Sequence, residues 1–499
     1  MATTRRLRRQ QGVILIMLTL VLMIVIPMAG LAFDVGLLYL IRTKLSAALD
    51  AAVLAGARSL SRGLDLASQI ESARATAEQY FRANFPQGLY GTTNLTFNAT
   101  VQETGYRTRT VSGVASVTAP LYFLRLLGQD TATMSTRATA SRRDVNLILV
   151  LDRSGSIAQA GATTVVKNSA ITFVNKFAEG RDRVGMISFS GYYRIDYPPS
   201  MTFKTSSPSV ADKINALDMA GNTGYAEALW QAYELLRQIN EPGALNVIVF
   251  FTDGRPTALT ANFPVKSLAD RRYGDGSSTY PSTSTLYNMP AAPSACISSG
   301  ATKFGFVSAP IMSSASWPPP VTGTTWGVMD ADASGSQDEW TVAPGSSGCN
   351  YAAGSGTSYR LRARRDIAYI PDTDAHGNST WGYKTYSSSE LFPAGHPYQG
   401  KIRVDSWRAV RYAAYNVADN AAARIRNDTT LSPVIFTIGL GGTSSEPIDD
   451  ELLMRVANDR NSPIFDPTRP AGLYAKAPTP AELDQAFLRV ASEILRLAE

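Results

Sequence analysis

The longest apolar stretch of the chain lies near its amino terminus, at residues 13–33, and is interrupted only by Thr19 and Pro27. About 20 apolar residues suffice to cross a bilayer as an α-helix. Basic residues before such a helix favour a cytoplasmic location, and four arginines precede this one: Arg5, Arg6, Arg8 and Arg9. The pattern predicts a cytoplasmic basic tail at 1–12, a single retained transmembrane helix at 13–33 and export of the rest. A cleaved signal peptide is the alternative.

Between this helix and residue 144, the polarity pattern predicts a small module of helices and strands. Residues 34–60 continue the helical pattern, and residues 62–85 have apolar positions at helical spacing. Alternating apolar and polar positions then predict strands at 95–102, 109–117 and 131–140, with a short helix at 121–127. We therefore expect an amino-terminal helix and an α+β stalk module at 34–143.

From Asp144 onward, strand and helix patterns alternate along the chain. Strands are predicted at 145–151, 184–189, 246–252 and 433–439, with two short edge strands at 193–197 and 201–205. Helices are predicted at 162–177, 224–236, 404–426, 451–457 and 482–497. This alternation predicts an α/β domain of Rossmann-like architecture, with a mostly parallel sheet and helices on both faces. Ligands of such sheets bind beyond the carboxyl ends of the strands.

A long segment rich in Ser, Gly, Pro, Thr and Tyr interrupts this alternation at residues 258–401. A stretch of this length with few apolar runs is typical of an inserted functional element or of disorder. Because strand and helix patterns resume after it, we interpret it as an insertion in one domain. The α/β domain then consists of a first part at 144–257 and a second part at 402–499.

Charge and residue usage exclude several classes of function. The formal net charge is +6, but without the four amino-terminal arginines the chain has 43 basic and 41 acidic residues. A nucleic-acid-binding protein would have a basic stripe on a folded domain, so no nucleic-acid partner is expected. The chain has two histidines, both in the insertion, and lacks a Gly-rich phosphate loop, a zinc ligand set and a serine-nucleophile elbow. We therefore expect a protein that is not an enzyme.

The candidate chemistry lies at the end of the predicted strand 145–151. The strand is followed by three oxygen-bearing side chains at alternate positions: Asp152, Ser154 and Ser156. Carboxylate and hydroxyl oxygens are ligands that suit a small divalent cation. The alternative is that the aspartate and the serines merely cap a helix and a turn at the strand end.

Two further segments complete a known pattern: Gly221–Thr223 before a helix, and Thr252–Gly254 after a strand. Together the three segments resemble the metal-ion-dependent adhesion site (MIDAS) of a von Willebrand factor A (VWA) domain. The resemblance implies a ligand set of five residues: Asp152, Ser154, Ser156, Thr223 and Asp253. The serines would bind directly, the threonine directly or through water, and the aspartates mostly through water. The implied ion is Mg²⁺, with Mn²⁺ or Ca²⁺ as alternatives, and its open position would attract a carboxylate from a partner protein.

The amino-terminal segment carries a second resemblance. Gly12, the apolar run, and the segments Ala32–Tyr39 and Leu45–Ala57 are similar to the amino-terminal part of TadG-like Flp pilus-assembly proteins. Pilin-like relatives are cut after a glycine and have Glu at the fifth mature position. Here the fifth residue after Gly12 is Met17, so no such processing is expected.

The two resemblances together imply a membrane-anchored component of a tight-adherence pilus system. It would lie in the inner membrane of a bacterium with its bulk in the periplasm or outside the cell. Its VWA domain would bind a pilus or envelope protein through the metal. Two alternatives remain: a surface adhesin that contacts its ligand through the insertion, and a structural scaffold in which the metal is incidental. The sequence leaves a homo-oligomer open.

The insertion contains two further candidate features. Its residues Asp330, Asp332, Ser334 and Asp338 match the start of an EF-hand calcium loop. The twelfth position is Thr341 instead of Glu, so a polar surface turn is the favoured interpretation and a Ca²⁺ site the alternative. The segment Asp372–Asn378 is a weaker match. The only cysteines, Cys296 and Cys349, are predicted to form a structural disulfide, because export permits one. Two free thiols or intermolecular pairing are the alternatives.

Overall fold

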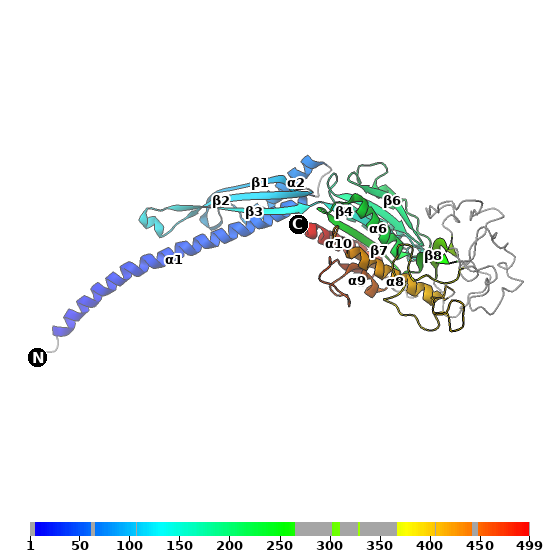
Figure 1. Cartoon of the computed structure of the whole chain (residues 1–499). Coiled ribbons are helices and arrows are strands. Elements are labelled where there is room, and N and C mark those ends of the chain that lie inside the picture. The colour runs from blue at the N-terminus through cyan, green and yellow to red at the C-terminus, as the bar shows by residue number, and fades with distance from the viewer. Residues whose placement is uncertain are drawn as a thin grey trace. The chain divides into compact units, whose positions relative to one another are not determined.

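A computed structural model of the chain describes residues 5–60, 65–105, 107–264, 302–309, 328–329, 367–404, 406–441 and 448–498. The chain divides into two compact units, Met1–Arg143 and Asp144–Ala498 (Figure 1). Each unit has a hydrophobic core of its own.

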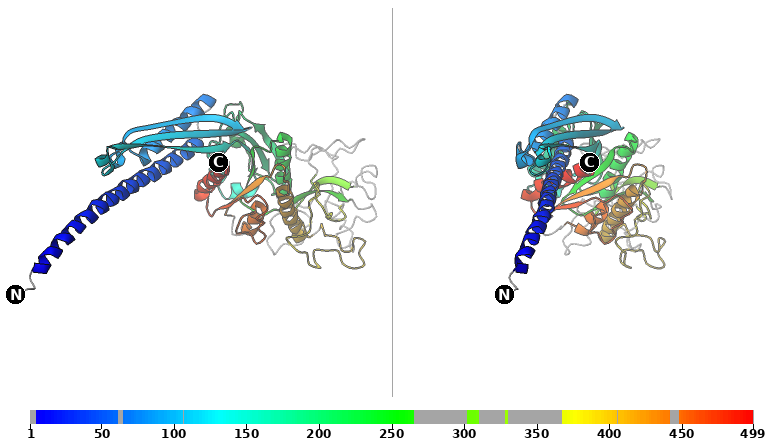
Figure 2. Two further views of the ribbon diagram at one scale, coloured as in Figure 1. Left: turned by 60° about the vertical axis from the view of Figure 1, so that its left-hand side comes forward. Right: turned by 90° about the vertical axis from the view of Figure 1, so that its left-hand side faces the viewer.

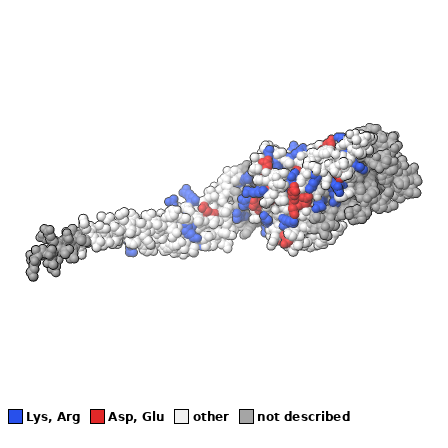
Figure 3. All heavy atoms as spheres, turned by 90° about the horizontal axis from the view of Figure 1, so that it is seen from below, with Lys and Arg blue, Asp and Glu red and all other residues white. Residues whose placement is uncertain are grey.

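The amino-terminal unit begins with a long helix, α1, which runs from Arg5 to Ser59. It contains the predicted apolar helix and continues through the predicted helix at 34–60. Among the described residues, this is the one helix long and apolar enough to cross a membrane, and its most apolar window is 6% buried. In Figure 3, the surface of α1 next to the grey amino-terminal residues is free of charged side chains.

The second half of α1 packs with another helix against a three-stranded sheet (Figures 1 and 2). That helix is α2, Leu66–Asn84, which begins with a capping box formed by Asp65 and Ser68. The antiparallel strands have the order β1-β2-β3, and their bounds are β1 Thr93–Gly105, β2 Thr108–Pro120 and β3 Thr131–Arg143. Two short 3₁₀ helices lie in the connections: η1 Leu89–Gly91 between α2 and β1, and η2 Leu124–Leu127 between β2 and β3. The predicted strands and helices are confirmed, and each strand is longer than predicted.

Alternation along β2 explains this packing. Val111, Ala115 and Val117 are buried in a common core with the small residues of α1. Gly113 continues this row, and a Cβ atom there would lie 2.7 Å from a methyl group of Val53. The glycine therefore lets the helix approach the sheet closely.

The carboxyl-terminal unit is built on a six-stranded sheet of order β12-β11-β7-β4-β5-β6. The strands are β4 Val145–Asp152, β5 Arg183–Phe189, β6 Tyr193–Ser200, β7 Leu245–Thr252, β11 Val434–Leu440 and β12 Tyr474–Ala477. Neighbouring strands are parallel, except that the edge strand β6 is antiparallel to β5. The sheet confirms the predicted α/β fold.

Helices cover both faces of this sheet (Figure 2). They are α3 Gly155–Gln159, α4 Thr163–Val174, α5 Val210–Asn215, α6 Tyr225–Ile239, α8 Trp407–Arg426, α9 Asp450–Ala457, η5 Pro480–Glu482 and α10 Leu483–Ala498. The side chains of alternate residues of β4 point to opposite faces of the sheet and pack in two different cores. The core with α4 and α10 contains Leu147, Leu149 and Leu151. The core with α6, α8 and α9 contains Ile148 and Val150. Since both sets are fully buried, β4 lies at the centre of the domain.

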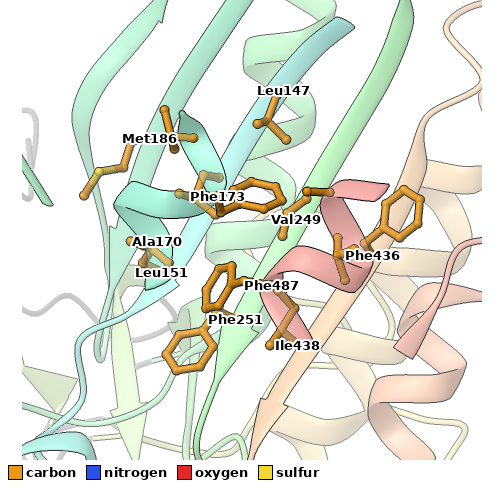
Figure 4. Close-up of a cluster of buried hydrophobic side chains, with 14 of the residues drawn as sticks. Leu147, Leu151, Ala170, Phe173, Met186, Val249, Phe251, Phe436, Ile438 and Phe487 are labelled. Carbon is orange, nitrogen blue, oxygen red and sulfur yellow. The ribbon is translucent and has the colours of Figure 1, made fainter. Parts of the chain in front are cut away.

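Three aromatic rings join α4, α10 and the sheet (Figure 4). The ring centroid of Phe487 on α10 lies 5.6 Å from that of Phe173 on α4 and 5.6 Å from that of Phe251 on β7. All three side chains are fully buried. The last helix of the chain is therefore part of the domain core.

One expectation for this unit was wrong, and one strand was not predicted. The predicted edge strand at 201–205 is absent: β6 ends at Ser200, and the Ser200 hydroxyl accepts a hydrogen bond from the Thr202 backbone N–H (3.1 Å), which closes a turn there. The pattern also missed the short strand β12, Tyr474–Ala477.

Parts of the segment 258–401, which was interpreted as an insertion, have regular structure. Strands β8 Ala258–Pro264, β9 Thr302–Ser308 and β10 Val328–Met329 form an antiparallel sheet of order β10-β9-β8. Alternate residues Leu259, Ala261 and Phe263 of β8 are buried in a core with Ile367, Ile370, Ile402 and residues of α8. These short runs are separated widely in the sequence, so their common core is not evident from local pattern.

Candidate metal centre

The candidate ligands lie at the carboxyl ends of two adjacent parallel strands, β4 and β7. Leu151 on β4 pairs with Phe251 on β7, so Asp152 and Asp253 follow at the same edge of the sheet. The chain places β5 on one side of β4 and β7 on the other. Such a reversal of strand order leaves a crevice at the strand ends, where ligands of open α/β sheets bind.

Four of the five predicted ligand side chains are connected by hydrogen bonds. The Ser156 hydroxyl donates to Asp253 Oδ1 at 2.7 Å, and the Ser154 hydroxyl lies 3.4 Å from the same oxygen. The two serine hydroxyls are 2.9 Å apart. The backbone N–H of Ser154 donates to Asp152 Oδ1 at 2.7 Å. The oxygens of these four residues therefore converge at one point of the sheet edge.

The fifth predicted ligand, Thr223, lies on a loop that is hydrogen-bonded to the loop that carries Ser154 and Ser156. The Ala220 N–H donates to the Arg153 carbonyl (2.7 Å), and the Gly155 N–H donates to the Gly221 carbonyl (3.2 Å). Gly221 has a φ of +97°, a conformation that favours glycine, and a Cβ atom there would lie 3.0 Å from the Ser190 side chain. The glycine before Thr223 is thus needed for this loop to approach its neighbours.

The backbone of Thr223 also holds the start of the inserted segment. Its N–H donates to the Thr257 hydroxyl at 3.0 Å. Its carbonyl accepts from the N–H groups of Thr257 (2.8 Å) and Ala258 (3.1 Å). Strand β8, the first strand of the inserted segment, therefore begins next to the candidate site.

Two buried residues outside the predicted ligand set support the carboxylates. The Thr252 hydroxyl donates to Asp152 Oδ2 at 2.6 Å and accepts from the Gly254 N–H at 3.2 Å. The Tyr225 hydroxyl donates to the Gly254 carbonyl. Thr252 belongs to the motif that sequence reasoning used, although no role was expected for it. Tyr225 follows the Thr223 loop, and the sequence indicated only that it lies at the start of a helix, not that it supports the site.

The electrostatics of the cluster fit a cation. Asp152 and Asp253 are buried, with exposed fractions of 0% and 3%. Burial, and then the charge of Asp253, raises the pKa of Asp152 to about 7, and burial raises the pKa of Asp253 as well. Like charges held together in a buried site disfavour ionisation, and a divalent cation between them would remove this penalty. The donor set of carboxylates and hydroxyls has the hard oxygens that Mg²⁺ and Ca²⁺ prefer.

Neutral hydroxyls supply the rest of this donor set. Among the described residues, no group of three or more His, Cys, Asp and Glu side chains could hold a metal ion. The candidate site has two carboxylates and therefore depends on Ser154, Ser156 and Thr223 for the remaining protein oxygens. A cation held in this way would keep much of its positive charge and would attract a further anionic ligand.

Most of the other sequence candidates lie outside the described residues, namely Asp330, Asp332, Ser334, Asp338, Cys296 and Cys349. The weaker calcium candidate at 372–378 is described. There the Asp374 carboxylate accepts the N–H groups of His376 and Asn378, both at 2.8 Å, and Asp372 pairs with Lys401 at 2.7 Å. These carboxylates are engaged by donors of the protein itself, as in a polar surface turn.

The 372–378 turn contacts the helix that follows the Thr223 loop. His376 Nε2 lies 2.8 Å from Oε2 of Glu227, a nearly buried residue in the first turn of α6. The His376 ring stacks on Trp230, with centroids 5.7 Å apart. Arg424 of α8 lies over the same indole ring at 4.3 Å and donates to the His376 carbonyl at 2.9 Å. The sequence did not indicate this contact, because its members are distant along the chain.

The His376–Glu227 pair predicts a pH-dependent contribution to stability. Burial lowers the pKa of His376, but the hydrogen bond and charge of Glu227 outweigh it, so the pKa lies above its ordinary value. Such a pair stabilises the fold fully below the unfolded-state pKa of about 6.5, and loses this contribution as pH rises through the higher folded-state pKa. In urea unfolding, His376→Gln should therefore lose more stability in acidic than in alkaline buffer. His396→Gln is the matched control, and an equal loss at both pH values would contradict the assignment.

Comparison with known families finds one match in each of the two units of the chain. Residues 147–255 match the von Willebrand factor type A domain, and residues 12–59 match the Flp pilus-assembly TadE/G-like family. The carboxyl-terminal unit is thus a VWA domain. The chain therefore carries a TadE/G-like segment and a VWA domain, which confirms both resemblances. No curated protein sequence matches the chain.

Several solved structures are similar to the chain at low identity. The vWF domain of the type V pili tip protein Mfa5 from Porphyromonas gingivalis is 17% identical, with a TM-score of 0.36, over 72% of this chain and 98% of that one. The pilus adhesin SpaC from Lactobacillus rhamnosus GG is 13% identical, with a TM-score of 0.36, over 81% of this chain and 34% of that one. Proximal thread matrix protein 1 from the mussel byssus, with a zinc-occupied MIDAS motif, is 10% identical, with a TM-score of 0.31, over 70% and 47% of the two chains.

Proposed function

We propose that the chain is a membrane-anchored, exported component of a Flp or Tad-type pilus assembly or adhesion system, and that its VWA domain binds a protein partner through a divalent cation. The partner is a pilus or envelope protein that offers a carboxylate to the metal. Binding, without turnover, is the function of the site. The anchor is α1, which lies in the bacterial inner membrane with its basic end in the cytoplasm and the bulk of the chain in the periplasm or outside the cell.

One observation carries the proposal: hydroxyl and carboxylate oxygens from two strand ends meet within hydrogen-bonding distance at the edge of the VWA sheet. Ser154 and Ser156 would hold the cation directly, and Asp152 and Asp253 would balance its charge through bound waters. The backbone attachments of the Thr223 loop place a further hydroxyl residue at the same edge. Mg²⁺ suits these ligands because it prefers oxygen and retains several waters, one of which a partner carboxylate can replace.

A pull-down from bacterial envelope extract tests this proposal. The full chain is used as bait in buffer with Mg²⁺ or with EDTA, as wild type and as the double variant Ser154→Ala, Ser156→Ala. The matched control is Ser200→Ala, Thr202→Ala, because these two residues form a hydroxyl pair at the same spacing, 2.9 Å apart, outside the site. We expect a partner that is captured by the wild type and the control in Mg²⁺, and that is lost in EDTA and with the site variant.

The result distinguishes the proposed function from the scaffold alternative. A partner retained equally by the site variant, in both buffers, would mean that the metal site does not carry the interaction. Loss of capture by the control variant as well would point to a general defect of the domain, and circular dichroism of each variant identifies such a defect.

A further inference from the structure

The loop between β2 and β3 exposes an unusual number of large apolar side chains. It contains η2 and connects Pro120 to Thr131. The exposed fractions are 84% for Leu126, 78% for Leu127, 55% for Tyr122 and 39% for Phe123. Four large apolar residues are thus exposed within six positions of one loop, and clustered exposed apolar side chains mark interaction sites.

This loop is fastened to α1 at the carboxyl end of the apolar run. The buried carboxylate of Asp34 accepts three backbone N–H groups of the loop, those of Tyr122 (3.0 Å), Phe123 (2.9 Å) and Leu124 (2.7 Å). The ring of Phe33 also contacts the rings of Tyr122 and Phe123, at centroid distances of 6.1 and 5.8 Å. The position of the loop along α1 is therefore fixed by both polar and aromatic contacts.

One further contact brings the loop alongside the apolar run itself. The side chain of Phe123 lies over Gly30, one helical turn before Asp34, and a Cβ atom on Gly30 would be 2.4 Å from its ring. Gly30 is the residue that leaves room for this ring. Phe123 therefore lies beside residues of α1 that belong to the predicted membrane-spanning stretch.

The length of the apolar run relates these contacts to the depth of a bilayer. Residues 13–33, at ~1.5 Å per residue, span about 31 Å, and the hydrocarbon core of a bilayer is about 30 Å thick. If the run crosses the membrane, Gly30, Phe33 and Asp34 lie at its exported boundary. The apolar side chains of the loop then lie at the same boundary. Tyrosine at this depth is typical of membrane interfaces.

We propose that the loop at 121–128 inserts its apolar side chains into the phospholipid bilayer surface beside α1, as a second, non-spanning membrane contact. Leu126 and Leu127 enter the outer edge of the hydrocarbon, and Tyr122 lies at the level of the headgroups. The exposed Arg125 is paired with the exposed Asp130 of the same loop at 3.2 Å, so the loop carries no unbalanced charge next to its apolar side chains. Two attachments, the helix and the loop, restrict the tilt of the amino-terminal unit on the membrane. This inference rests on the membrane anchoring proposed above.

The test measures the depth of spin labels on the full chain in nanodiscs of phosphatidylethanolamine and phosphatidylglycerol. Labels are placed at Leu127→Cys, at Leu22→Cys within the apolar run, and at Gln102→Cys, an exposed position toward the far end of β1. The background carries Cys296→Ser and Cys349→Ser. Power-saturation EPR compares the accessibility of each label to oxygen, which concentrates in lipid, and to a nickel chelate, which stays in water.

We expect the Leu127 label to resemble the Leu22 label, with an oxygen-to-nickel accessibility ratio several-fold above that of the Gln102 label. A ratio equal to that of Gln102 would place the loop in water and overturn the inference. A label shielded from both agents would show that protein covers the loop, from a second copy or another partner, and would overturn it too. If the Leu22 label itself stays in water, the proposed anchoring has failed, and the loop inference fails with it.

Discussion

Replacing Asp253 by Asn should stabilise the metal-free VWA domain and remove the stabilisation that Mg²⁺ gives to the wild type. Asp152 and Asp253 are buried together, and the charge of Asp253 contributes to the raised pKa of Asp152. Asparagine removes the repulsion, and each pKa unit relieved corresponds to about 1.4 kcal/mol. In the wild type, Mg²⁺ at a hundredfold excess over its dissociation constant should add about 2.7 kcal/mol. The variant should lose this gain, because one of its two anionic groups is missing.

Thermal unfolding of a fragment spanning residues 144–499, in EDTA and in Mg²⁺, measures both effects. Asp372→Asn is the matched control, since Asp372 lies outside the cluster and pairs with Lys401. The control should keep the wild-type response to Mg²⁺. An Asp253→Asn variant that is stabilised by Mg²⁺ as strongly as the wild type would contradict the assignment of Asp253 to the metal centre.

Because Asp152 and Asp253 are buried together, the stability of the metal-free wild type should depend on pH. The folded-state pKa of Asp152, about 7, is higher than the value of about 3.9 in an unfolded chain. The folded state therefore binds the proton more tightly, and the stability contributed by this group falls as pH rises from about 4 to about 7. Asp253→Asn should make this slope shallower in EDTA, because one cause of the raised pKa is gone.

Hydrophobic periodicity predicted most of the regular elements of both units. The runs at 147–151 and 247–251 are apolar at every position, and this is the pattern of strands that are buried on both faces. The amphipathic helices α6 and α10 likewise follow from their spacing. Local pattern failed at two elements. Residues 201–205 follow Pro198 and Pro199 and form a turn in place of the predicted strand. Strand β12 has four residues, too few to show a periodic pattern of apolar positions.

The candidate site was less accessible to sequence reasoning than the fold. Motif spacing indicated the five oxygen-bearing residues, and the structure brings four of them into one hydrogen-bonded cluster. The supporting contacts of Tyr225 and the pair formed by His376 and Glu227 could not be predicted. They join residues 29 and 149 positions apart, which only the folded chain places together. The cation and its partner stay predictions.

The largest effect on stability should come from Phe487→Ala at the end of the chain. The Phe487 ring is fully buried between Phe173 and Phe251, and it joins α10 to α4 and to the sheet. Truncation of a buried phenylalanine costs about 3–5 kcal/mol, from lost transfer free energy and the remaining cavity. This is a large share of the roughly 5–15 kcal/mol that stabilises a typical domain. Urea denaturation of the 144–499 fragment should show the loss as a lower midpoint.

Ile464→Ala is the control for this experiment, because Ile464 is 43% exposed and its truncation should change stability by less than about 0.5 kcal/mol. A loss below about 1 kcal/mol for Phe487→Ala would mean that α10 is not an integral part of the domain core. Phe487 belongs to the hydrophobic core and is not among the groups that form the oxygen cluster. The fraction of Phe487→Ala that remains folded should therefore gain the same stabilisation from Mg²⁺ as the wild type, whereas Asp253→Asn should not. The two variants thus separate the stability of the domain from the binding capacity of its metal centre.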